Sequence, residues 1–347
     1  MYNFENMKGR FIMKTPSFAI LIHLGENMWG DMIAQKEMHF DREVWNNIVD
    51  KCLKEGIDTI VLDLGEGVVY PSHPEIAIPG AWTAEETKRE VARLKALGLR
   101  IIPKLNFSAV HDAWLGIYER MVSTPEYYKV VRDLIFDAYE LFDKPEYIHI
   151  GMDEESPKHA DDPKYEFVCI RRGNLWHHDI KYLSECVKEA GSKVFIWGCP
   201  FMYYEEPYEY MDKDTLIGES NYYEFKKEKW TKISDQSKEV QEFYATRFAQ
   251  RYGYTIEYVE EDPVVQLAID TIKKCAERGF PIAPVSSNIF IKTNDRSTVE
   301  YYSEQDYRDS IKMYIGCPWI MTNKKNEAAI LEEIELLGSA KREFYGE

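Results

Sequence analysis

The stretch "TAEETKREVARLKALGLRIIPKLN", residues 83–106, contains the unit from which the fold can be predicted. Its first part has helical periodicity, with Thr83 and Glu86 at the spacing of an N-terminal capping box and Gly98 as a C-terminal stop. The apolar run 99–106 follows at once and has the length of a buried strand. A helix that leads directly into a buried strand is typical of proteins with a parallel sheet.

The same unit recurs along the chain, because short apolar runs bounded by turn residues alternate with amphipathic stretches. Eight runs are predicted to be strands: residues 18–24, 59–65, 99–106, 147–152, 193–198, 215–220, 282–288 and 314–321. Eight strand-helix units in 347 residues predict a (β/α)8 barrel, whose usual size is about 250 residues plus insertions. A doubly wound open sheet is the alternative, but the first predicted strand lacks the GxGxxG turn of that fold.

We expect residues 1–347 to form a single domain, because no linker rich in Gly, Pro or Ser and no internal repeat interrupts the chain. A helical insertion is predicted at about 226–279, between the sixth and seventh strands. A C-terminal helix is predicted at about 326–343.

Composition limits the possible partners. Apolar residues make up 45% of the sequence, enough for a well-buried core, and 60 acidic against 43 basic residues give a formal net charge of -17. This excess of negative charge disfavours a nucleic acid or an anionic membrane surface as a partner. The start of the chain lacks a signal-peptide pattern and no run of 18 apolar residues occurs, so a soluble cytoplasmic protein is expected.

The six cysteines show neither the CxxC spacing of a zinc site nor the density of a disulfide scaffold, so we predict mostly buried free thiols and no cofactor. The aromatic run 201–211 is predicted to be a packed loop, with a subunit contact in a homo-oligomer as the alternative.

The predicted strand in "EYIHIGMDEES", residues 146–156, ends in three consecutive carboxylates, Asp153, Glu154 and Glu155. Neighbouring carboxylates repel one another and resist losing water, so packing gives no reason to place them there. Carboxylates at such a position therefore either lie in solvent or take part in chemistry. We assign Glu155 to solvent, whereas Asp153 has helix capping as its structural alternative.

Other strand ends are also rich in acids, amides and aromatic residues, and in a (β/α)8 barrel these ends form the active site. Aromatic faces stack on the apolar face of a sugar ring, and polar groups bind its hydroxyls. The sequence thus predicts a carbohydrate site. Its candidate residues are Glu26, Asp63, Asn106, His111, Asp153, Glu154, Trp197, Asn221, Tyr222, Tyr223 and Trp319.

Four motifs resemble those of the glycoside hydrolase family 20 β-N-acetylhexosaminidases. "WTAEETKREVARLKALGLRIIPKLNFSAVHDAW", residues 82–114, resembles the family's helix, third strand and following loop. "YIHIGMDEES", residues 147–156, is similar to the family's "HIGGDE" signature. "GSKVFIWG", residues 191–198, resembles the fifth strand with its tryptophan, and "SNYY", residues 220–223, stands where the family has a tyrosine-bearing loop.

The resemblance implies a retaining hydrolase that cleaves terminal N-acetylhexosamine, with the substrate's own acetamido oxygen as the nucleophile. It implies that Glu154 protonates the leaving oxygen and that Asp153 stabilises the acetamido nitrogen. His111 is expected to contact Glu154. The expected substrate-binding residues are Trp197 and Trp319 as walls, Tyr223 or else Tyr222 as donor to the acetamido oxygen, and Asn221, Glu26, Asp63 and Asn106.

Several positions depart from the family pattern. Lys104 and Asn106 stand where the family has Glu and Asp, and Met152 replaces the second glycine of the signature. The first strand has no arginine for sugar hydroxyls. These departures leave the identity of the sugar open.

Two other functions stay open. Glu26, Asp63, His111, Asp153 and Glu219 could gather a divalent metal for an isomerase or hydrolase, although no HxH or HExxH spacing supports this. Alternatively, the barrel could bind glycans without cleaving them.

Overall fold

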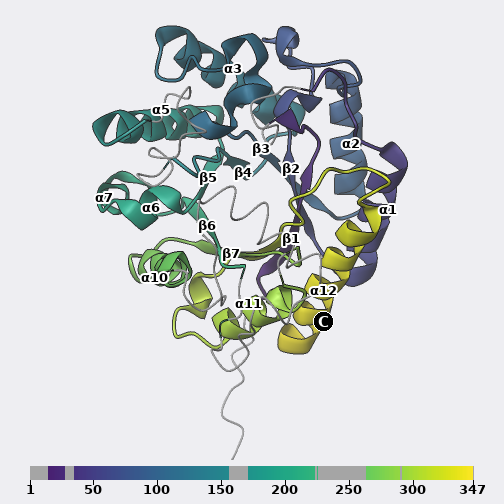
Figure 1. The fold of residues 1–347 in the computed structure, drawn as a ribbon, viewed down its shortest axis with the longest axis vertical. Coiled ribbons are helices and arrows are strands. Elements are labelled where there is room, and N and C mark those ends of the chain that lie inside the picture. The colour runs from purple at the N-terminus through teal and green to yellow at the C-terminus, as the bar shows by residue number, and fades with distance from the viewer. Residues whose placement is uncertain are drawn as a thin grey trace, which may run out of the picture.

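The computed structural model describes residues 15–27, 35–155, 171–222, 225, 263–289 and 291–346. Eight parallel strands pair in sequence order, and β8 pairs with β1 to close a barrel (Figure 1). Helices surround the strands. The predicted (β/α)8 fold is confirmed.

The strands of the barrel fall on the predicted apolar runs. They are β1 (Ser17–His23), β2 (Thr59–Asp63), β3 (Arg100–Lys104), β4 (Tyr147–His149), β5 (Lys193–Trp197), β6 (Leu216–Ser220), β7 (Ile282–Ser286) and β8 (Met313–Gly316). All the predicted runs except the sixth extend past the C-terminal end of the observed strand. These additional residues form loops at that end of the barrel, where an active site is expected.

The helical elements around the barrel vary in length. The α-helices are α1 (Arg42–Glu55), α2 (Ala84–Ala96), α3 (Pro125–Leu141), α5 (Asn174–Ala190), α6 (Cys199–Tyr203), α7 (Glu206–Tyr210), α10 (Pro263–Glu277), α11 (Asn294–Ser303) and α12 (Glu327–Tyr345). Short 3-10 helices are η2 (Gly65–Gly67), η3 (Pro74–Ile76), η4 (Ala109–Tyr118) and η10 (Arg308–Ser310). Of the predicted insertion, residues 226–262 lie outside the described residues, and α10 follows them. The single-domain organisation stays a prediction.

Helix α2 shows how the sequence sets these boundaries. Thr83 and Glu86 form the capping box, in which the amide of Glu86 donates to Thr83 Oγ1 at 3.2 Å and the amide of Thr83 donates to Glu86 Oε2 at 2.8 Å. Gly98 adopts φ +85°, a conformation that favours glycine, and the chain then enters β3.

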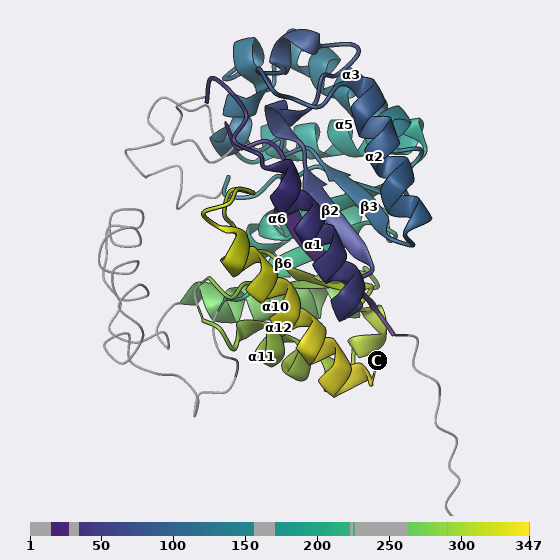
Figure 2. The same cartoon turned by 90° about the vertical axis from the view of Figure 1, so that its right-hand side faces the viewer.

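The last helix closes the ring of helices by packing beside the first (Figure 2). In this contact Lys341 Nζ of α12 donates to the carbonyl of Gly56, just after α1, at 2.8 Å. Within the described ranges, no helix is long and apolar enough to cross a membrane.

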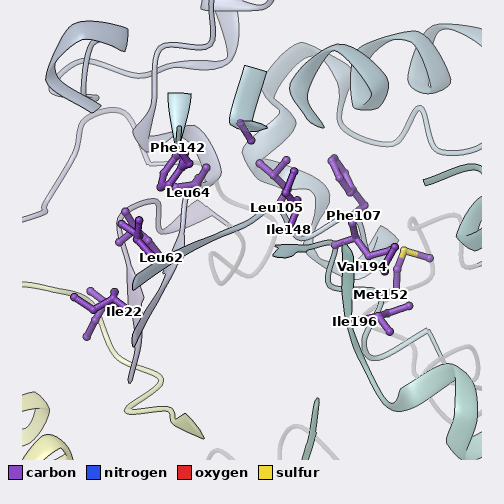
Figure 3. Packing of buried hydrophobic residues seen from close by; sticks show 14 of the residues in the cluster. Ile22, Leu62, Leu64, Leu105, Phe107, Phe142, Ile148, Met152, Val194 and Ile196 are labelled. Carbon is purple, nitrogen blue, oxygen red and sulfur yellow. The ribbon is translucent and has the colours of Figure 1, made fainter. Parts of the chain in front are cut away.

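Side chains alternate between two buried cores, because successive residues of a strand point to opposite faces. The outer core lies between strands and helices and includes Ile22, Leu62, Ile148 and Met152 (Figure 3). The inner core fills the barrel with residues such as Leu21, Val61, Ile102, Phe195 and Trp197. Cys52, Cys186, Cys275 and Cys317 are buried free thiols, as predicted, and Cys199 is a partly exposed one, while Cys169 lies outside the described residues.

A buried pair of carboxyl groups joins α11 to α12. Asp295 accepts from Ser286 Oγ at 2.6 Å, and Glu333 accepts from the amide of Asn288 at 2.7 Å. Burial raises the pKa of Asp295 to about 6, and burial together with the Asp295 charge raises the pKa of Glu333 well above its usual range. The pair therefore holds a proton in the folded protein at a pH where the unfolded chain has released it.

We predict that this pair makes the protein less stable as the pH rises. Its contribution is fully present below the ordinary carboxyl pKa, about 4.5, and is lost as the pH rises through the folded pKa values. The free energy of unfolding should fall by about 1.4 kcal/mol per pH unit for each additional proton that the folded state binds. Glu333→Gln, whose amide can donate to Asp295 at any pH, should flatten this slope in urea denaturation between pH 5 and 8.

Glu332→Gln on the same helix is the matched control, because Glu332 is a partly exposed residue paired with Lys292. Equal slopes for the wild type and Glu333→Gln would show that the pair does not hold the proton.

Candidate active site

The chain leaves β4 through a strained turn that carries the predicted acids. Gly151, Met152 and Glu154 have φ angles of +73°, +70° and +60°. Left-handed backbone is uncommon outside glycine and costs about 1–3 kcal/mol per residue, and it persists only where surrounding contacts hold it, often at functional sites. Met152, which stands at the second glycine position of the family signature, thus keeps a glycine-like conformation.

Asp153 is held in place by three residues of the loop after β3. Asn106 Nδ2 donates to Asp153 Oδ1 at 3.0 Å, and Ser108 Oγ donates to the carbonyl oxygen of Asp153. His111 Nε2 lies 3.6 Å from Asp153 Oδ2. Burial would raise the pKa of Asp153, but the charge and hydrogen bond of His111 lower it below its usual value. Asp153 is therefore a carboxylate at neutral pH.

His111 connects both acids. Its Nε2 atom also lies 3.3 Å from Glu154 Oε2. Burial alone would lower the pKa of His111, but the charges and hydrogen bonds of Asp153 and Glu154 raise it to about 10. A positively charged imidazole thus bridges two neighbouring carboxyl groups, which reduces the repulsion between them.

Glu155 does not lie in solvent, and that prediction is wrong. Its side chain is buried, with Oε1 accepting from the amide of Ala109 at 2.7 Å and forming an ion pair with Arg171 Nη2. Its Oε2 accepts from the amide and Nε of Arg171, both at 3.0 Å. The partner cation is 16 residues away in the sequence, so no local pattern indicated that this carboxylate would be neutralised.

Aromatic rings gather at one part of the barrel mouth, where Trp319 also lies 5.8 Å from His23 at the end of β1. The ring centroids of Trp197 and Trp319 are 6.1 Å apart, and His149 lies 4.3 Å from Trp197. Tyr222 packs against the inner core together with Trp319. The indole Nε1 of Trp197 is buried and has no hydrogen-bond partner among the described residues. It is a donor that a bound ligand could use.

The acids of the first two strands already have partners. Asp63 is buried in an ion pair with Lys104 and lies 3.4 Å from His23 Nδ1. The carboxylate of Glu26 lies 3.1 Å from His39 Nδ1 and is almost fully buried. Asp63 ends β2 and Glu26 lies in the loop after β1, and both carboxylates are occupied within the protein. Their role in substrate binding stays a prediction.

The remaining predicted residues lie after β6. Asn221 is buried, and its carbonyl accepts from Asn294 Nδ2 at 2.9 Å. Tyr222 is described, whereas Tyr223 lies outside the described residues. Within the described ranges, no three His, Cys, Asp or Glu side chains gather as a metal-binding group, so the alternative set of Glu26, Asp63, His111, Asp153 and Glu219 is not assembled.

Sequence reasoning gave Glu219 no role except as a metal ligand. It is the last residue but one of β6, and its Oε1 accepts from the amide of Ser220 at 2.8 Å. Burial and the negative charge of Asp153 raise its pKa to about 8, so a neutral carboxyl group stands near the acid pair at neutral pH. The position of Glu219 near the end of a predicted strand was the feature of the sequence that could have indicated a place in the active site. Ser108 and Arg171 were missed because their contacts depend on tertiary structure alone.

No family model and no curated protein sequence matches the chain. Solved structures do match. A β-N-acetylhexosaminidase from Bacteroides fragilis is 11% identical with a TM-score of 0.59, and the match covers 93% of this chain and 65% of that one. A GH20 exo-β-N-acetylglucosaminidase from Vibrio harveyi, in complex with N-acetylglucosamine, is 12% identical with a TM-score of 0.54, covering 96% and 57%. The fold is similar to that of family 20 glycoside hydrolases.

Another match to this fold is the pneumococcal virulence factor StrH, 15% identical with a TM-score of 0.55, which covers 95% of this chain and 84% of that one. The chain spans less than two thirds of the length of the Bacteroides and Vibrio proteins. At these identities the likeness concerns the family 20 fold, and the catalytic roles rest on the site itself.

We predict that Gly151→Ala damages the site. A Cβ at Gly151 would lie 2.1 Å from Asn106 Oδ1, and the displaced Asn106 could no longer hold Asp153. Gly98→Ala is the control, because Gly98 is also left-handed but its Cβ would meet nothing within 4 Å. Gly151→Ala should lose about 1–3 kcal/mol more stability than Gly98→Ala in urea denaturation, the usual cost of overpacking. Equal losses would mean that the turn can relax.

Proposed function

We propose that the protein is a retaining glycoside hydrolase that removes terminal N-acetylhexosamine from glycans by substrate-assisted catalysis. The observation that carries this proposal is the Asp153–Glu154 pair after β4, bridged by His111 at 3.6 Å and 3.3 Å. The similarity in fold to enzymes described as β-N-acetylhexosaminidases supports it. So does the N-acetylglucosamine bound to the Vibrio protein.

The two acids take different roles because their surroundings differ. Asp153 accepts hydrogen bonds from Asn106 and faces a positively charged His111, so it stays ionised and can stabilise the positive charge that grows on the acetamido nitrogen. Glu154 is the neighbouring carboxyl group and would protonate the leaving oxygen, then deprotonate the attacking water. Adjacent side chains on one strand end cannot easily flank both faces of a glycosidic bond, which favours the acetamido oxygen as nucleophile.

The aromatic side of the mouth would hold the sugar. Trp197 and Trp319 offer ring faces, and the unpartnered Nε1–H of Trp197 offers one donor. We assign the donor to the acetamido oxygen to Tyr223 or Tyr222. The remaining proposed binding residues are Asn221, Glu26, Asp63 and Asn106. The carboxylates of Glu26 and Asp63 would bind the substrate while they keep their contacts to His39 and Lys104.

The first test is Glu154→Gln, which should lower kcat about 10²- to 10⁴-fold on aryl N-acetylglycosides with poor leaving groups. The amide has the size of the acid but cannot give a proton, so binding of N-acetylglucosamine by calorimetry and the thermal midpoint should be unchanged. Glu146→Gln is the control, because this exposed residue lies just before β4 at the opposite end of the strand. If Glu154→Gln kept near wild-type rates, another residue would have to be the general acid. Sugar binding by a wild type without turnover would favour a glycan-binding barrel.

The second test concerns the nucleophile. Asp153→Asn should lower the rate strongly, because an amide cannot stabilise the charge on the acetamido nitrogen. Substrates with a 2-hydroxyl should react poorly with the wild type, and an oxazoline-like inhibitor should bind. Steady-state rates on matched 2-acetamido and 2-hydroxy aryl glycosides measure this. Covalent labelling of a carboxylate by a 2-deoxy-2-fluoro glycoside, seen by mass spectrometry, would instead support a protein nucleophile.

A further inference from the structure

Arg171 forms a buried network around the strained turn after β4. Its amide and Nε donate to Glu155 Oε2, and its Nη2 pairs with Glu155 Oε1. The same Nη2 donates to the carbonyl of Phe107 at 2.6 Å and contacts Met152 Sδ at 3.6 Å. Nη1 donates to Asp179 Oδ2 at 3.0 Å in α5. One guanidinium therefore joins the loop after β3, the turn after β4 and a helix.

Glu155 transmits this network to the acid pair. It directly follows Glu154, and its Oε1 also accepts from the amide of Ala109, two residues before His111. Glu155 thus belongs to the turn that carries Asp153 and Glu154, and its carboxylate is hydrogen-bonded to the loop that carries His111. It therefore links the two loops directly.

The far side of the network is firmly anchored. Asp179 accepts from Ser123 Oγ at 2.6 Å and from Tyr128 OH at 2.5 Å. Burial would raise the pKa of Asp179, but the charge of Arg171 lowers it, so Asp179 is ionised. Arg171 is consequently held by two carboxylates and cannot move without breaking several hydrogen bonds.

Stability alone explains this arrangement poorly. Removing a guanidinium and two carboxylates from water costs several kcal/mol per ion, and apolar replacements of buried ion pairs are often equally stable. The network instead contacts the left-handed turn on both sides of Asp153 and Glu154, through the sulfur of Met152 and the carboxylate of Glu155. Strained backbone needs such contacts to persist.

We propose that Arg171 is a positioning residue that, acting through Glu155, sets the distance between His111 and the Asp153–Glu154 pair. The catalytic consequence rests on the proposed function, whereas the ionisation of His111 does not. Among the described residues, the titratable groups that face His111 are Asp153 and Glu154 on the turn and His23 at the end of β1. Loosening the turn would weaken the two attractive contacts and lower the pKa of His111.

The test is Arg171→Lys, which keeps the charge but cannot supply the planar fork that binds Glu155 and Asp179 together. We expect the pKa of His111, followed by NMR of the imidazole ring with His111→Asn for assignment, to fall by at least one unit from about 10. We also expect kcat to fall about 10- to 100-fold with a small change in KM, and its alkaline limit to move to lower pH, because small misplacements cost about 10²-fold.

Arg132→Lys is the matched control. Arg132 of α3 pairs with Glu189 of α5 through an exposed Arg–Glu contact of 2.5 Å, and neither readout should change. If Arg171→Lys does not fold, Glu155→Gln replaces it, because the amide keeps the size and one acceptor oxygen. A variant that is less stable but keeps the wild-type His111 pKa would overturn the proposal. A wild type without glycosidase activity would overturn the proposed function and leave the NMR test valid.

Discussion

Repulsion among three consecutive carboxylates is the constraint on which the mouth of the barrel depends. Asp153, Glu154 and Glu155 follow β4 in a partly dry site, where like charges raise one another's free energy steeply. The left-handed turn separates them into two environments. Two of them share the imidazole of His111, and the third pairs with Arg171 in the interior. Each of the three carboxyl groups thus lies beside a cation, and the strain of the turn is the cost of this arrangement.

The register of the barrel divides the layer beneath the site into two halves. His23, Asp63, Lys104 and His149 are successive partners across β1 to β4, so polar side chains occupy one half of the layer. The layer continues into Phe195 of β5 and Leu216 of β6. The ion pair of Asp63 and Lys104 neutralises charge in the polar half. The aromatic rings border both halves, because Trp197 lies 4.3 Å from His149 and 5.9 Å from Phe195, and Trp319 lies 5.8 Å from His23.

The sequence predicts the barrel well and the charge partners poorly, for a physical reason. Strand and helix positions are visible because burial imposes a short period on neighbouring residues, as in residues 83–106. Strand ends share one rim, so the gathering of Asn106, His111 and Asp153 follows from topology. The sequence position of the partner of a buried charge follows no such regular spacing. Glu155 meets Arg171 only because two loops converge, so its burial could not be predicted locally.

The departures from the family pattern act on the same group. The side-chain amide of Asn106 donates a hydrogen bond to Asp153. An aspartate at this position could donate such a bond only if it were protonated. Lys104, in place of an acid, adds a positive charge that lowers the pKa of Asp153 further. Met152 occupies a glycine-like conformation and reaches Arg171. Each replacement alone removes a family residue, but together they favour an ionised, fixed Asp153, the state that stabilisation of a cationic acetamido group requires.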